Sequence, residues 1–126
     1  MAFRLNKSLV STTPSVEYFE GKLNEAIKYG EALVLSVGKL TKCSSNVKPE
    51  FISLSDVICK NENEVVPVMR VFDFYLFTCP IRGGHEQLAC GDALAIDTDA
   101  EGITAEISGD VAKVVSVEGD YATIHF

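Results

Sequence analysis

The sequence predicts an all-β fold, a small barrel or sandwich built from two similar β-units and preceded by an extended N-terminal arm. Three observations support this prediction: short segments in which apolar and polar residues alternate, glycine-containing turns between them, and an internal repeat. The chain has 126 residues, 47% of them apolar, which suffices for one compact core but not for two domains. We therefore expect an arm over residues 1–28 and a single β domain over residues 29–126.

The internal repeat opens with a glycine, an acidic residue and a run of apolar residues, GEALVL in the first copy and GDALAI in the second. The matched segments, in chain order, are 30–35 with 91–96, 38–41 with 101–104, and 51–54 with 114–117. A further strand is expected at 64–71 in the first copy and at 121–126 in the second. Three landmarks in the same order indicate a duplicated unit, covering about residues 29–71 and 90–126.

Each unit has one apolar face that it cannot bury alone, so the two units are expected to pack together. They are joined by residues 72–89, a connection that begins with the most aromatic stretch of the chain, FDFYLFTCP at 72–80, and ends in a glycine-containing loop. We expect 72–80 to form a strand whose aromatic side chains lie in the core.

The first 28 residues differ from the rest, because isolated apolar residues stand there among serine, threonine and asparagine. No strand alternation extends over this segment, and it is therefore expected to be an arm. The spacing of its apolar residues also allows a short helix over residues 14–27, which Gly21 would interrupt.

Charge is distributed unevenly along the chain, whose net charge is −7. Residues 86–126 hold nine acidic residues and one lysine, whereas the preceding residues hold nine acidic and ten basic ones. A nucleic-acid binder usually presents a basic face, so direct binding to DNA or RNA is not expected. No run of roughly 20 apolar residues and no secretory signal occur, which predicts a chain made in the cytoplasm with no membrane association.

The cysteines and acidic residues do not predict a metal site or any cofactor. Four cysteines stand at positions 43, 59, 79 and 90, without the close pairs that bind zinc, and we expect free thiols. DTDAEG at 97–102 resembles the start of a calcium loop, but the twelfth position, which needs a bidentate glutamate, is Ser108. A solvated turn is the expected structure there.

No catalytic motif occurs in the chain, and we do not expect an enzyme. The only histidines are His85 and His125, and the one candidate for nucleophilic catalysis is His85 with Cys79 or Cys90. No nucleophile elbow, phosphate-binding glycine loop or HExxH sequence is present.

Four short segments resemble small head decoration proteins of tailed bacteriophages and prophages: YGEALVL at 29–35, GKLTK at 38–42, KPEFI at 48–52 and VPVMRV at 66–71. The similarity covers roughly residues 25–126. The resemblance implies a structural virion protein that binds the outer surface of the major capsid protein shell, stabilises it, and forms a homo-oligomer, often a trimer. It implies no catalytic residue and a location on the capsid surface, after synthesis in the host cytoplasm.

The apolar residues of the expected arm are the candidates for contacts between subunits, although each could instead contact its own barrel. These candidates are Phe3, Leu5, Leu9, Val10, Tyr18 and Phe19. Two other functions stay open: a small β-barrel binding module of a cellular complex, and a Cys/His-dependent enzyme. A carrier of a prosthetic group is disfavoured, since no lysine stands at the tip of a biotinyl-type or lipoyl-type hairpin.

Overall fold

The computed structural model describes residues 2–10, 13–83 and 88–126. In these ranges the chain forms strands and turns without a helix, which confirms the all-β prediction. The strands, in chain order, are β1 (Arg4–Ser8), β2 (Val16–Glu20), β3 (Ala26–Ile27), β4 (Ala32–Ser36), β5 (Lys39–Lys42), β6 (Phe51–Ser53), β7 (Val57–Ile58), β8 (Val65–Arg70), β9 (Tyr75–Arg82), β10 (Ala93–Ile96), β11 (Ile103–Thr104), β12 (Ala112–Glu118) and β13 (Tyr121–His125).

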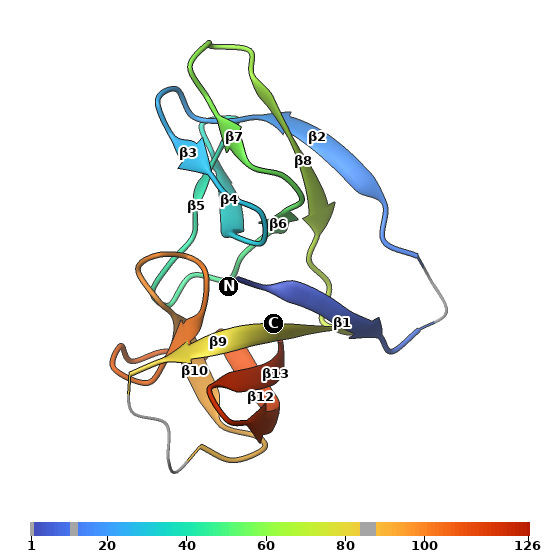
Figure 1. Cartoon of the computed structure of the whole chain (residues 1–126), viewed down its shortest axis with the longest axis vertical. Helices are drawn as coiled ribbons and strands as arrows, with labels where there is room; N and C mark the ends of the chain where they lie inside the picture. Colours follow the sequence, from blue (N-terminus) through green and yellow to red (C-terminus); the bar gives the residue numbers. More distant parts are fainter. Residues whose placement is uncertain (1, 11–12, 84–87) are drawn as a thin grey trace.

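The second half of the chain closes into a barrel. β9 pairs with β13, β13 with β12, β12 with β10, and β10 with β11, all antiparallel. β11 then returns to β9 in a parallel pairing that sets Ile103 beside Ile81. This second barrel forms the lower part of the molecule in Figure 1, and β1 extends its sheet by pairing with the first half of β9.

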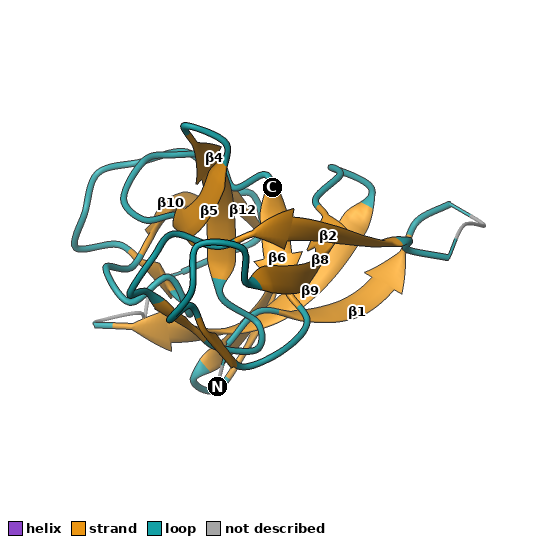
Figure 2. Cartoon of the chain, turned by 90° about the horizontal axis from the view of Figure 1, so that it is seen from above, coloured by secondary structure: helices purple, strands orange, loops and turns teal. Residues whose placement is uncertain are grey.

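The first half of the chain repeats the same strand order. Its sheet runs β2-β8-β6-β4-β5, and Gly21, directly after β2, forms a parallel bridge with Leu40 of β5. This bridge corresponds to the parallel pairing between β9 and β11 in the second barrel. The fold is therefore two tandem barrels of one topology, with the small β3–β7 sheet beside the first (Figure 1). Figure 2 shows that strands and loops make up the described residues.

The glycine–acid pair of the repeat has the same role in both barrels. Gly30 and Gly91 have φ angles of +83° and +95°, in the region that favours glycine. The carboxylates of Glu31 and Asp92 each accept a hydrogen bond from the backbone N–H three residues earlier, at 2.8 and 2.9 Å. The acidic residue thus caps a tight turn that starts the strand, which explains why the pair recurs.

Strand pairing corrects one detail of the predicted repeat. Leu33 lies opposite Phe51, and its equivalent Leu94 lies opposite Ala112. The counterpart of Phe51 is therefore Ala112, two residues before the Val114 that the sequence comparison assigned. A shift of two residues keeps the same face of the strand inward, so sequence alternation could not reveal it.

Two apolar clusters fill the molecule. The first occupies the interior of the first barrel and consists of Ile27, Leu33, Leu40, Phe51, Cys59, Val66 and Val68. The second fills the second barrel and continues between the barrels, where Ala32, Ile52 and Met69 from the outside of the first barrel join it. This shared cluster makes the two barrels one folded body.

The expected arm over residues 1–28 is not separate from the β domain, so this prediction and its boundary are wrong. β1 pairs with β9, and β2 pairs with β8 as a strand of the first barrel. Phe3 is buried, with its ring centroid 5.3 Å from that of Phe126. The helix allowed over residues 14–27 is likewise replaced by β2 and β3. The partners that order this segment lie far along the chain, so local sequence does not reveal them.

Candidate binding surface

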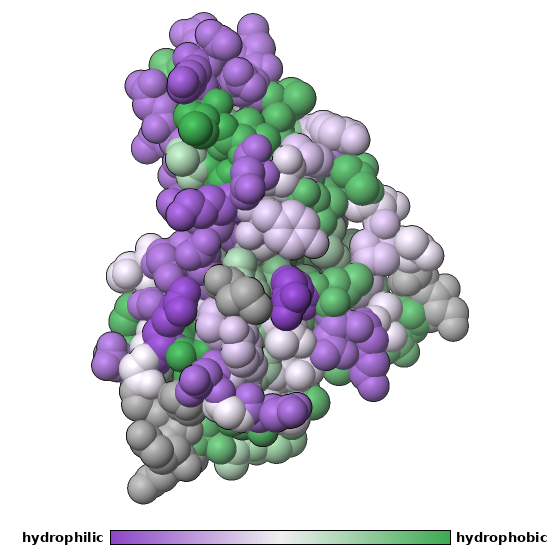
Figure 3. Space-filling view, viewed as in Figure 1, coloured by the Kyte–Doolittle hydropathy of each residue, from purple (hydrophilic) through white to green (hydrophobic). Residues whose placement is uncertain are grey.

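Exposed apolar side chains gather on β1, β2 and β8, in the segments that follow β1 and β8, and before β4. We call this set the apolar face; it comprises Leu5, Leu9, Val10, Val16, Tyr18, Tyr29, Val65 and Phe72. Tyr18 and Leu9 are the most open members, at 65% and 61% exposure. Figure 3 shows apolar side chains over the β2–β8 ribbon and beside β1, with polar residues between them.

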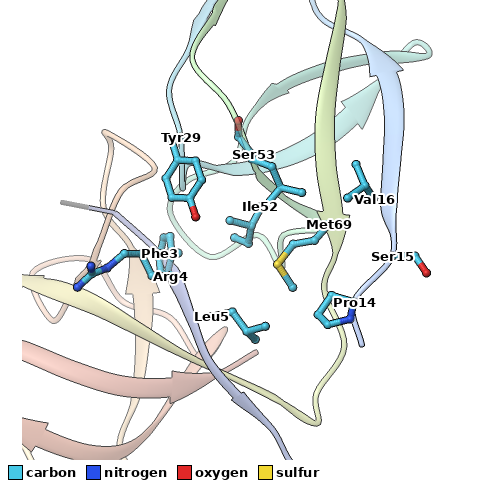
Figure 4. Close-up of a pocket in the computed structure, with 11 residues that line it drawn as sticks. Phe3, Arg4, Leu5, Pro14, Ser15, Val16, Tyr29, Ile52, Ser53 and Met69 are labelled. Carbon is cyan, nitrogen blue, oxygen red and sulfur yellow. The ribbon is translucent and has the colours of Figure 1, made fainter. Parts of the chain in front are cut away.

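Of two hollows in the surface, the one in this face lies between the barrels. It has a volume of about 290 Å³ and is bounded by β1 on one side and by the β2–β8 ribbon on the other. Ile52 and Met69, both buried, form its floor, while Leu5 and Val16 stand at its rim. Figure 4 shows Leu5 and Met69 pointing into the space between the two walls. The hollow is an apolar site suited to a large side chain of another molecule.

The second hollow, of about 520 Å³, lies beside the turn between β8 and β9. Phe72 and Phe74 stack there with ring centroids 5.0 Å apart. Next to them, Arg70 binds Glu17 through two hydrogen bonds of 2.9 Å and lies 4.9 Å from the ring centroid of Phe51. The hydrogen bond from Arg70 lowers the pKa of Glu17, so the pair stays ionised at neutral pH.

The structure brings most of the predicted contact residues to this face. The exposed ones are Leu5, Leu9, Val10 and Tyr18. Phe3 and Phe19 are different: Phe3 belongs to the shared core, and Phe19 packs against Phe51 with ring centroids 4.8 Å apart. Phe3 is buried and Phe19 is half-buried, so both side chains contribute to the packing of the fold.

Sequence reasoning missed four members of the apolar face, namely Val16, Tyr29, Val65 and Phe72. A signal for Val16 exists, since it alternates with Tyr18 along β2 and thus shares its face. Val65 begins the partner strand of β2, a pairing that no local pattern shows. Phe72 lies in a turn of a stretch expected to be core.

The buried cysteines are poorly suited to nucleophilic chemistry. Burial raises the pKa of Cys43 to about 12 and also raises the pKa of Cys79, which disfavours the reactive thiolate at neutral pH. Cys90 is exposed. His85, the expected partner of Cys79 or Cys90, lies outside the described residues, so this candidate pair stays a prediction.

The calcium-like loop at 97–102 forms an ion-pair cluster. Arg82 lies 2.9 Å from a carboxylate oxygen of Asp99 and 3.7 Å from one of Asp97. The other oxygen of Asp99 accepts a hydrogen bond from the backbone N–H of Glu101. Within the described ranges, no three metal-binding side chains come together.

Comparison with known proteins returned no match: neither a protein-family model nor a curated protein is similar to this chain. The part of the chain that the structure describes has no helix able to cross a membrane. Function must therefore be argued from the surface itself, and the apolar face is its most distinctive feature.

Proposed function

We propose that this chain is a structural binding protein, a capsid decoration protein of a bacteriophage or prophage that binds the outer surface of the major capsid protein shell. The observation that carries the proposal is the apolar face, with its hollow between the barrels. Surfaces of this kind mark sites of protein association. In this proposal the chain has no catalytic role, needs no cofactor, and acts as a homo-oligomer, such as a trimer.

The energetics of the apolar face suit a tight, lasting contact. Burial of one leucine-sized side chain contributes about 1.5–3 kcal/mol, from which the cost of ordering both partners must be subtracted. Half of the apolar face sits on strands that are already ordered, among them Val16 and Tyr18 on β2. The ordering cost is therefore smaller than for a flexible arm, and more of the burial energy remains for binding.

The charge distribution suits an orientation with the second barrel pointing outward. Residues 86–126, which contain β10 to β13, hold nine acidic residues against one lysine. The apolar face lies outside this segment, on β1, β2, β8 and the segments next to them and β4. Contact through that face leaves the acidic barrel toward solvent, where like charges keep assembled particles apart.

The proposal is tested by cosedimentation with expanded capsids assembled without this chain, taken from the phage or prophage that encodes it. We expect the chain to pellet with the shells and to saturate at a fixed ratio of copies to shell subunits. A chain that stays in the supernatant at every concentration would refute the proposal. Stoichiometric capture of a host complex in that case would favour the cellular binding module instead.

A further inference from the structure

β1 lies at the edge of its sheet, with β9 as its only strand neighbour in the described ranges. The backbone N–H of Phe3 donates to the carbonyl of Gly30, which belongs to the first barrel. Because successive N–H groups of a strand alternate between its two edges, the N–H of Leu5 points the same way, toward the first barrel. The unpaired edge of β1 therefore runs along the first hollow.

An unpaired edge beside an apolar hollow has the two parts of a strand-addition site. Backbone hydrogen bonds hold an added strand, and the hollow takes one of its alternating side chains. Figure 4 shows β1 running along the hollow, with the side chain of Leu5 turned into it. An added strand would thus lie over Ile52 and Met69, both at less than 5% exposure and already packed.

The charge along this edge selects the partner. Arg4 and Lys7 are exposed on β1, and neither takes part in an ion pair among the described residues. We propose that β1 binds an extended acidic segment of a partner protein, in which a large apolar residue enters the hollow and carboxylates meet these two cations. The inference rests on the proposed function for the partner's identity, a shell subunit.

A second copy of this chain does not fit the site. Antiparallel pairing of two β1 strands would bring four cationic side chains of the two copies together, which repel each other. The acidic half cannot supply the strand either, since each of the strands β9 to β13 already has neighbours on both edges. The edge strand β2 is acidic as well, but its Glu17 and Glu20 already form ion pairs with Arg70 and Lys39, so we assign the acidic segment to a different protein.

The test uses the full chain and two capped peptides, one alternating leucine with glutamate and one alternating leucine with lysine. Fluorescence anisotropy at low salt should show the glutamate peptide binding about tenfold more tightly. Amide exchange should slow in residues 4–8 on binding. Equal affinity for the two peptides, or no binding of the glutamate peptide, would overturn the inference.

Charge reversal provides a sharper test. Arg4→Glu/Lys7→Glu should reverse the preference, so that the lysine peptide binds more tightly. Lys48→Glu/Lys60→Glu is the matched control, because it changes two exposed lysines elsewhere and leaves the net charge equal to that of the first variant. An unchanged preference in the β1 variant, or equal changes in both variants, would overturn the inference.

Removal of a backbone donor separates strand addition from simple charge attraction. Leu5→Pro deletes the outward N–H of β1, and an edge strand tolerates proline on its free side. This variant should lose peptide binding, whereas Leu5→Val should keep it. Full binding by Leu5→Pro would overturn the inference. Peptide binding without capsid binding would refute only the proposed function. Capsid binding that is unchanged in both the Arg4/Lys7 variant and the Leu5 variant would refute only this inference.

Discussion

The equivalence of the two barrels predicts equal sensitivity at Leu33 and Leu94. Both side chains are buried in the barrel interiors, at 0% and 5% exposure. Truncation of either to alanine removes three carbon groups at about 0.8 kcal/mol each, or about 2.4 kcal/mol. The cavity left behind adds to this loss, since buried leucines cost about 2.7–5 kcal/mol when truncated. We expect about 3–4 kcal/mol at each position.

Denaturant unfolding followed by far-UV circular dichroism measures this cost, because the chain has no tryptophan for a fluorescence probe. The shared cluster between the barrels predicts a single transition in both variants. The double variant should lose the sum of the two costs to within about 0.5 kcal/mol, since the two leucines lie in separate interiors. A nearly neutral change at either leucine would refute the duplicated-barrel reasoning for that half.

Four further predictions concern thiols, pH, the N-terminal strands and metals. A thiol reagent should label only Cys90 in the native chain and all four cysteines after denaturation, because the other three are buried; fast labelling of a second thiol would contradict this. Burial raises the pKa of Glu31, so the folded chain binds the proton of this carboxyl more tightly than the unfolded chain does. The stability that Glu31 contributes is therefore complete below about pH 4.5 and is lost as the pH rises through the folded pKa. Glu31→Gln should therefore flatten the fall of unfolding free energy as pH rises above about 4.5, and an unchanged slope in urea melts would count against it. Deletion of residues 1–20 should abolish the cooperative thermal transition, because it removes β1, β2 and buried Phe3; a normal melt would show that these strands are dispensable. Thermal melts with EDTA, calcium or zinc should coincide, and a shift of many degrees with one metal would contradict this.

The duplication could be predicted from sequence because its signal is local. A glycine that must adopt positive φ, followed by an acid that caps the same turn, leaves the same letters in both barrels. The core residues are less alike. Phe51 of the first barrel corresponds to Ala112 of the second, and Phe77 of β9 supplies aromatic bulk to the second core instead. Only the total volume of a core is constrained, so its individual positions diverge.

The N-terminal strands could not be predicted, because their patterns lack period-two alternation. β1, RLNKS, is almost wholly exposed and shifts register between Leu5 and Lys7, so it has no inward apolar series. β2, VEYFE, is apolar on both sides, with Phe19 facing the barrel and Tyr18 on the apolar face. Such a strand is recognised only through its partner, β8, which lies about 50 residues later.

The contact surface could be predicted only in part. Leu5, Leu9, Val10 and Tyr18 were identifiable as apolar residues without a local core to join. The hollow in this face was not, because it forms where β1 meets the outside of the first barrel, a contact between segments distant in sequence. Charge along β1 is visible in the sequence, but its meaning depends on the unpaired edge.

The central claim is that the apolar face is the surface that binds the shell. Cosedimentation with undecorated capsids tests it most directly when Val16→Asp/Tyr18→Asp is compared with Val47→Asp/Ile58→Asp. All four side chains are exposed, at 50% or more, and the two variants carry the same charge change. We predict that the first variant melts like the unmodified chain and loses capsid binding, whereas the second keeps it. Capsid binding that survives in the first variant would contradict the claim.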